Sequence, residues 1–192
     1  MRYATKAGLI TALWLAGGAS ASATGVSEKL AACFGCHGPN GQSQIENLPS
    51  LAAQVPAYSL IQLVMFRDKL RMSDTMNDAA KGLSDSDIQS LADALAALPA
   101  PKPPPDPIDQ ARFERARALA QQSHCDVCHR PDFSGQQTVP RLADQREDYL
   151  LNTLREYKSG ARHAYEPIML EQVQPLDDLQ LVELSYYLAH AR

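Results

Sequence analysis

Two copies of a Cys-x-x-Cys-His motif constrain this chain more than any other feature of its 192 residues. The copies are Cys33–His37 and Cys125–His129, and the pattern is the attachment signature of c-type haem. Two thiols three residues apart can each bond one vinyl group of the same porphyrin, which leaves the following histidine beside the iron. The predicted attachment residues are all four cysteines of the chain: Cys33, Cys36, Cys125 and Cys128. The sequence therefore predicts two covalent haem c groups, with His37 and His129 as proximal iron ligands.

Other uses of paired cysteines explain less of this pattern. A four-cysteine zinc site does not need a histidine after each pair. A thioredoxin-like redox pair gives no reason for two copies 92 residues apart. Disulfide bonds occur in exported proteins, but they leave both histidines unexplained.

The N-terminus has the pattern of an export signal. Arg2 and Lys6 precede an apolar stretch over 7–19, and Ala21–Ala23 is a small-residue cleavage site. We expect residues 1–23 to be removed and the protein to be periplasmic. An uncleaved membrane anchor is the alternative, although the apolar stretch is short for a membrane span and is interrupted by Gly17 and Gly18.

The charge of the chain bears on its partners. The net charge is −4, and it becomes −6 when Arg2 and Lys6 leave with a segment that has no acidic residue. A mildly acidic chain without basic runs argues against a nucleic-acid partner.

An internal repeat divides the chain into two similar units. Leu48–Gln54 returns as Val139–Gln145, and Tyr58 returns as Tyr149. The separation is 92 residues at the cysteines, 91 at the two prolines of the repeat and 93 at Met76 and Met169. Offsets that drift by only one or two residues indicate duplicated domains.

The segment 99–107 has six prolines in nine residues, which forbids a helix and favours an extended spacer. We therefore expect an N-terminal domain over 24–98, a linker over 99–107 and a C-terminal domain over 108–192. Both are expected to be all-α, because apolar residues recur at helical spacing and no alternating run is evident. We expect helices that begin at Ser27, at Ser84 and near Asp177. Three more are expected to cover 57–69, 109–122 and 147–158. Units of about eighty residues have marginal cores, and a covalent haem would supply apolar filling.

The iron ligand on the side of the haem opposite each histidine distinguishes an electron carrier from an enzyme. Met76 and Met169 lie 39 and 40 residues after the two motif histidines, at equivalent places in the repeat. We predict these thioethers as the distal ligands; the alternative is that they only fill gaps in the core. Met72 is a rival in the first unit, and His163 is a rival in the second.

Four other repeated residues suit the surroundings of a haem. Pro49 and Pro140 follow the proximal histidines at matching distances, so a loop carbonyl nearby would accept the other ring proton. They could equally be turn prolines. Arg71 and Arg162 could pair with haem propionates; solvated arginines at helix ends are the alternative.

With these motifs in place, the chain resembles class I two-haem c-type cytochromes of the cytochrome c4 family. The matching segments are Cys33–Gly41, Leu48–Ala52 and Met76 ahead of Leu83–Asp85, together with Cys125–His129, Val139–Ala143 and Met169 ahead of Leu176. The resemblance implies two cytochrome c folds that face each other, each around one His/Met haem, and electron transfer in the periplasm. The chain departs from the family pattern at Arg130–Phe133, where a Gly-Pro-Asn-Gly run is expected, and in its proline-rich linker.

The leading functional hypothesis is a non-catalytic electron carrier between respiratory partners. Its partners would be redox proteins such as an oxidase, a cytochrome complex or a dehydrogenase, with peripheral membrane association through a membrane-bound partner. The first alternative is the electron-accepting cytochrome subunit of a periplasmic dehydrogenase, as in a flavocytochrome. A two-haem peroxidase is less favoured, because paired methionines would block both irons.

Overall fold

The computed structural model describes residues 20–162 and 167–191, with side chains from residue 25 onward. Helices make up the regular structure of these ranges, apart from one isolated bridge between Gln136 and Val139. The helices are α1 (Ser20–His37), the short η1 (Pro39–Gly41), α2 (Pro56–Arg67), α3 (Asp74–Ala80), α4 (Asp85–Ala96), α5 (Gln110–Gln122), α6 (Cys125–His129), α7 (Glu147–Ser159), α8 (Pro167–Val173) and α9 (Asp178–His190). The expected all-α class is confirmed.

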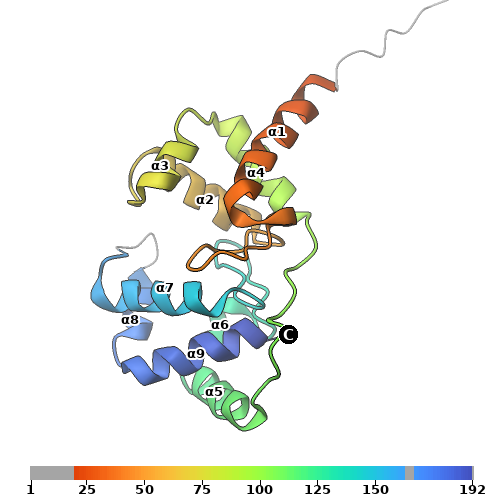
Figure 1. Cartoon of the computed structure of the whole chain (residues 1–192). Coiled ribbons are helices and arrows are strands. Elements are labelled where there is room, and N and C mark those ends of the chain that lie inside the picture. Colours follow the sequence, from red (N-terminus) through yellow and green to blue (C-terminus); the bar gives the residue numbers. More distant parts are fainter. Residues whose placement is uncertain (1–19, 163–166, 192) are drawn as a thin grey trace, which may run out of the picture.

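The N-terminal half is built on the packing of α2 against α3 and α4 (Figure 1). α4 begins with a reciprocal cap, in which Ser84 accepts from the backbone of Asp87 and the Asp87 carboxylate accepts in return. Its Ile88, Leu91 and Leu95 are spaced along one face and are all buried. Helical spacing of apolar residues therefore identified the core side of α4.

The C-terminal half repeats this plan with a larger core. α9 packs against both α5 and α7, and it begins with a reciprocal cap between Asp177 and Gln180. Phe133 meets Tyr187 edge to face at 5.5 Å, beside the buried Leu181 and Leu184. The loop after the second haem motif thus contributes an aromatic ring to the core of the second half.

The expected start of the first helix was wrong. α1 begins at Ser20, seven residues before Ser27, and runs without interruption into the first haem motif. The six residues between these positions include two alanines, which have the best helix propensity, but also Gly25 and Val26, which have a lower one. α1 therefore crosses the expected cleavage site, whereas residues 1–19 lie outside the described ranges. Among the helices of those ranges, none combines the length and the apolar character that a membrane span needs.

The second haem motif is connected differently from the first. α5 ends at Gln122 and His124 adopts a left-handed conformation with φ of 52°, so α6 is a separate short helix. The first motif instead occupies the last turn of the long helix α1. The two halves therefore share the motif but differ in the structure of the segment that precedes it.

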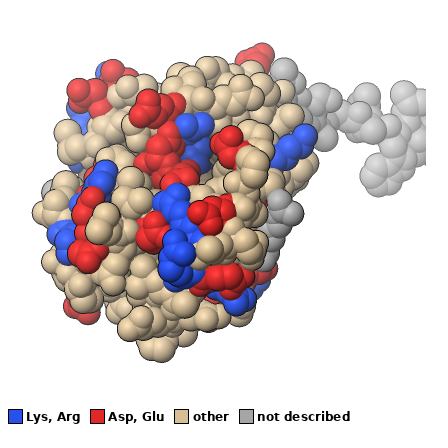
Figure 2. Space-filling view, turned by 60° about the horizontal axis from the view of Figure 1, so that its bottom comes forward, with Lys and Arg blue, Asp and Glu red and all other residues tan. Residues whose placement is uncertain are grey.

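The two halves pack directly against each other, as the sequence suggested. Figure 1 shows the loop after α1 and the loop after α6 meeting at the centre, while the linker runs along one side. Hydrogen bonds cross between the loops, including Ser50 to Gln145 at 2.8 Å and Arg141 to Gln54 at 2.7 Å. Figure 2 shows acidic and basic side chains intermixed on one face of the assembled molecule.

Candidate haem sites

The two motif histidines occupy equivalent buried positions. His37 is the last residue of α1 and its Nδ1 lies 2.8 Å from the carbonyl oxygen of Pro49. His129 is the last residue of α6 and its Nδ1 lies 2.9 Å from the carbonyl oxygen of Pro140. A carbonyl can only accept, so each Nδ1 carries the proton and each Nε2 is left with a lone pair for a metal. The expected role of both prolyl carbonyls is confirmed.

Burial also sets the charge of these rings. Desolvation lowers the pKa of His37 and of His129, and the hydrogen bond to each prolyl carbonyl opposes this effect only in part. The rings are therefore neutral at neutral pH, which is the form that binds iron.

The cysteines of each motif are placed for attachment to one planar group. Cys33 and Cys125 are half-buried, Cys36 and Cys128 are exposed, and none of the four forms a disulfide. The i,i+3 spacing puts both thiols of a pair on the same side of a helical turn. Burial raises the pKa of the Cys125 thiol to about 11.

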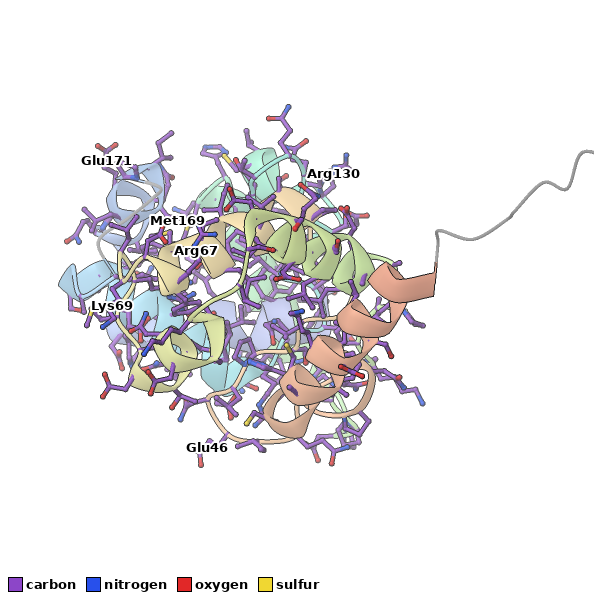
Figure 3. All side chains as sticks on the ribbon, turned by 90° about the horizontal axis from the view of Figure 1, so that it is seen from above. Glu46, Arg67, Lys69, Arg130, Met169 and Glu171 are labelled. Carbon is purple, nitrogen blue, oxygen red and sulfur yellow. The ribbon has the colours of Figure 1, made fainter. Side chains whose placement is uncertain are left out.

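The predicted distal methionines lie on corresponding short helices. Met76 is half-buried in α3, where its amide donates to the cap residue Ser73 at 3.5 Å. Met169 is half-buried in α8 and packs against the core of the C-terminal half. Figure 3, which looks down from above, shows Met169 inside the outline of the molecule and Glu171 at its edge. The rival Met72 is 71% exposed, and His163 lies outside the described residues.

The N-terminal half has apolar side chains that the protein covers only in part. Successive apolar residues of α2 are neither buried nor fully exposed: Leu60, Ile61, Leu63, Val64 and Met65. Such a helix, in the same half as the buried His37, fits a large apolar group that would complete its cover. The residues present therefore fit a haem.

An arginine–tyrosine cluster joins the two halves. Nη2 of Arg162 donates to the hydroxyl of Tyr58 in the other half at 3.3 Å, and Arg162 is 8% exposed. Arg162 and Arg71 of the N-terminal half both act on the pKa of Tyr149. The four residues are two repeat-related pairs, so the cluster is formed by equivalent positions of both units. Neither arginine is a solvated helix-end residue.

The cluster is electropositive. Burial raises the pKa of Tyr58 to about 12. Burial also acts to raise the pKa of Tyr149, but Arg162 and Arg71 outweigh it and lower that pKa to about 8. Two guanidinium groups that favour the anionic form of a neighbouring phenol also suit carboxylates such as haem propionates.

Sequence reasoning missed two glutamines of the interface. Gln54 and Gln145 are both buried, and each contacts the loop that follows the haem motif of the other half. The available signal was that both residues end the repeated segment. Nothing in the sequence showed that this segment faces its own copy.

Arg130, directly after the second proximal histidine, is strained. Its φ of 70° and ψ of 159° match those of Gly38 in the first unit, which are 78° and 164°. This region of conformational space is essentially restricted to glycine. The departure from the family pattern at Arg130 therefore places a long side chain on a backbone conformation that favours glycine.

Replacing Arg130 by glycine should stabilise the protein by about 1 kcal/mol, because relief of strain exceeds the added entropy of the unfolded chain. For a chain of this size the midpoint of thermal unfolding should rise by about 2–4 °C. Gly38→Ala is the matched control and should destabilise, since a Cβ there would clash with the carbonyl oxygen of Gln42. A lower midpoint for Arg130→Gly would show that the arginine side chain contributes more than its strain removes.

Comparison with known proteins identifies the family. The model of the family "Cytochrome c" matches residues 26–96 and 113–192. Cytochrome c4 of Thiocapsa roseopersicina is 31% identical over 165 residues, covering 81% of this chain and 85% of that protein. A protein named thiosulfate dehydrogenase electron acceptor, from Thiomonas intermedia, is 29% identical and covers 89% of this chain and 83% of its own length.

A solved structure agrees with this assignment. Cytochrome c4 of Acidithiobacillus ferrooxidans superposes with a TM-score of 0.72 at 25% identity, covering 83% of this chain and 98% of that structure. The match extends across both halves. The chain belongs to the cytochrome c family, as a two-haem class I cytochrome that carries two covalently bound haem c groups and transfers electrons.

Proposed function

We propose that this cytochrome is a periplasmic carrier of single electrons between respiratory redox proteins. Its irons are ligated by His37 with Met76 and by His129 with Met169. The observation that carries this proposal is the equivalence of the two buried histidine rings, each neutral and oriented by a prolyl carbonyl. We further propose that 24–98 and 108–192 form the two haem domains, that 99–107 links them, and that residues 1–23 are an export signal.

The side chains around each iron hold it rather than react. When bound, haem supplies the exchange of one electron between ferric and ferrous iron. The prolyl carbonyls fix the histidine tautomer, and the thioethers would favour ferrous iron and keep small ligands away. Arg71 and Arg162 would neutralise propionates between the halves. This set of roles suits electron transfer without substrate chemistry.

A second candidate function follows from the relatives. Proteins named thiosulfate dehydrogenase electron acceptor align over most of this chain. The corresponding role here would be to accept electrons from a periplasmic dehydrogenase. Rapid mixing of the oxidised cytochrome with the reduced dehydrogenase of the same cell should distinguish the two functions. Fast reduction of the haem supports the acceptor role, whereas an absence of reduction supports a carrier that serves other partners.

The mature protein should contain two haems that survive extraction with acidified acetone. Both haems are bound through thioether bonds, which acid does not break. Mass spectrometry should give the mass of the chain from residue 24 plus two haem masses. One haem, or none, would contradict attachment at both motifs, and a mass that includes residues 1–23 would contradict cleavage of the signal.

A further inference from the structure

Two peptide groups accept hydrogen bonds from the proximal histidines through their carbonyl oxygens. The N–H of each of these peptide groups donates a hydrogen bond to the opposite half. The carbonyl of Pro49 accepts from His37, and the amide of the same peptide unit is the N–H of Ser50. This N–H donates to Oε1 of Gln145 at 2.8 Å. One peptide group therefore links the proximal histidine of the N-terminal half to a glutamine of the C-terminal half.

The second half has the same arrangement with the roles exchanged. The carbonyl of Pro140 accepts from His129, and the N–H of Arg141 in the same peptide unit donates to Oε1 of Gln54 at 2.7 Å. The glutamine Nε2 atoms complete the contact: Gln54 donates to the Arg141 carbonyl at 3.1 Å and Gln145 to the Ser50 carbonyl at 2.9 Å. Residues in equivalent repeat positions thus form two reciprocal clamps.

Each glutamine is held in the orientation that this contact needs. Oε1 of Gln54 also accepts from the amide of Val55 at 2.9 Å, and Oε1 of Gln145 accepts from the amide of Arg146 at 3.0 Å. Both side chains are buried, with exposures of 9% and 7%. Because two backbone amides point at each Oε1, the oxygen and nitrogen of the side-chain amide are fixed by their partners. In such surroundings hydrogen bonds in series polarise one another.

The polarisation has a defined direction. Donation by the peptide N–H places more negative charge on its carbonyl, which becomes a stronger acceptor for the histidine ring proton. A stronger acceptor makes the imidazole a better electron donor to iron. Greater donation stabilises ferric iron and lowers the reduction potential, since hydrogen bonding around the ligands is one of the protein's means of setting it.

We propose that Gln145 tunes the haem of the N-terminal half and Gln54 the haem of the C-terminal half, as positioning residues that act across the interface through one peptide group. The inference rests on the proposed ligation of iron by His37 and His129. It makes the potential of each haem depend on contact with the other half. The glutamines are therefore more than a clamp that holds two domains together.

The test is a spectroscopic redox titration of the full-length holoprotein with Gln145→Met and Gln54→Met. These variants keep the side-chain length and remove both cross-interface bonds. In Gln145→Met the haem of the N-terminal half should become easier to reduce, with a severalfold higher ferrous-to-ferric ratio at a fixed applied potential. The haem of the C-terminal half should change much less, and Gln54→Met should give the reverse pattern. Nuclear Overhauser effects from haem methyl groups to side chains of their own half assign each potential.

The controls separate tuning from loss of packing. Gln89→Met removes an exposed hydrogen bond to Asp93 within α4, has no part in the contact between the halves, and should leave both potentials unchanged. The 15N signal of His37 Nδ1 in the ferrous protein should shift in Gln145→Met and not in Gln54→Met. If Gln145→Met does not fold, Gln145→Asn withdraws the acceptor with a smaller change and should give the same crossed pattern.

Two results would overturn the inference in distinguishable ways. Equal shifts of both potentials in each variant, or no shift with normal spectra, would show that the glutamines only clamp the halves. A wild-type protein without the low-spin spectrum of a six-coordinate haem would instead contradict the ligation on which the inference rests.

Discussion

Replacement of Met169 by alanine should lower the reduction potential of the C-terminal haem by on the order of hundreds of millivolts, since the choice of axial ligand spans about 0.8 V. A thioether favours ferrous iron, and its loss also opens the distal side to small ligands. The variant should therefore bind carbon monoxide at one haem, whereas the wild-type protein should bind none. Met76→Ala should have the same effect on the N-terminal haem. Redox titration and the visible spectrum of the reduced protein under carbon monoxide measure both effects.

Met72→Ala is the matched control for this experiment. Met72 is 71% exposed and lies before the start of α3, so its loss should alter neither the potential nor ligand binding. In the second unit the corresponding comparison is His163→Ala. If that variant changes the C-terminal haem while Met169→Ala does not, the iron is ligated by two histidines and the methionine assignment fails.

Much of the fold could be predicted because its signals are local. Apolar spacing identified the buried faces of α4 and α9, and side chains that favour helix starts preceded both. The repeat placed Pro49 and Pro140 near the proximal histidines, and their carbonyls are found there. The start of α1 was missed because Ser27, a residue type that favours helix starts, lies inside α1 and not at its beginning.

The interface could not be read from the sequence in the same way. Gln54 and Arg141 are 87 residues apart, and Gln145 and Ser50 are 95 apart. A repeat shows that two units share a fold but does not show which surfaces they use to meet. Arg162 is an example, because its buried contact with Tyr58 depends on how the two halves are placed relative to each other. The clamp and the arginine–tyrosine cluster are therefore products of tertiary packing.

The two halves should differ in how much they depend on their haems. The N-terminal half has the smaller described core: Ala52, Phe66, Ala80, Ile88, Leu91, Ala92 and Leu95. Three of these seven residues are alanines, which bury little apolar area. The C-terminal half buries more than twice as many apolar residues, including Leu150, Leu154, Leu181 and Leu184. A protein core of this size is marginal for the first half unless the haem completes it.

The double variant Cys33→Ala/Cys36→Ala should therefore unfold the N-terminal half and leave much of the C-terminal half folded. The expected loss is on the order of 5 kcal/mol, which is the whole stability of a marginal domain. Limited proteolysis followed by mass spectrometry should give a resistant fragment that begins near the linker and retains one haem. The physical cause is exposure of the apolar residues of α2, which the protein itself covers only in part.

Cys125→Ala/Cys128→Ala is the matched variant, and its expected outcome is different. Leu154, Leu181 and Leu184 are buried against protein, so α7 and α9 should keep part of their packing without haem. Proteolysis should then be slower in the C-terminal half of this variant than in the N-terminal half of the first. Equal cleavage rates in the two variants would show that both halves owe the same share of stability to haem, despite their unequal cores. Cleavage of both halves in either variant would show instead that the clamps formed by Gln54 and Gln145 make the two halves unfold as one unit.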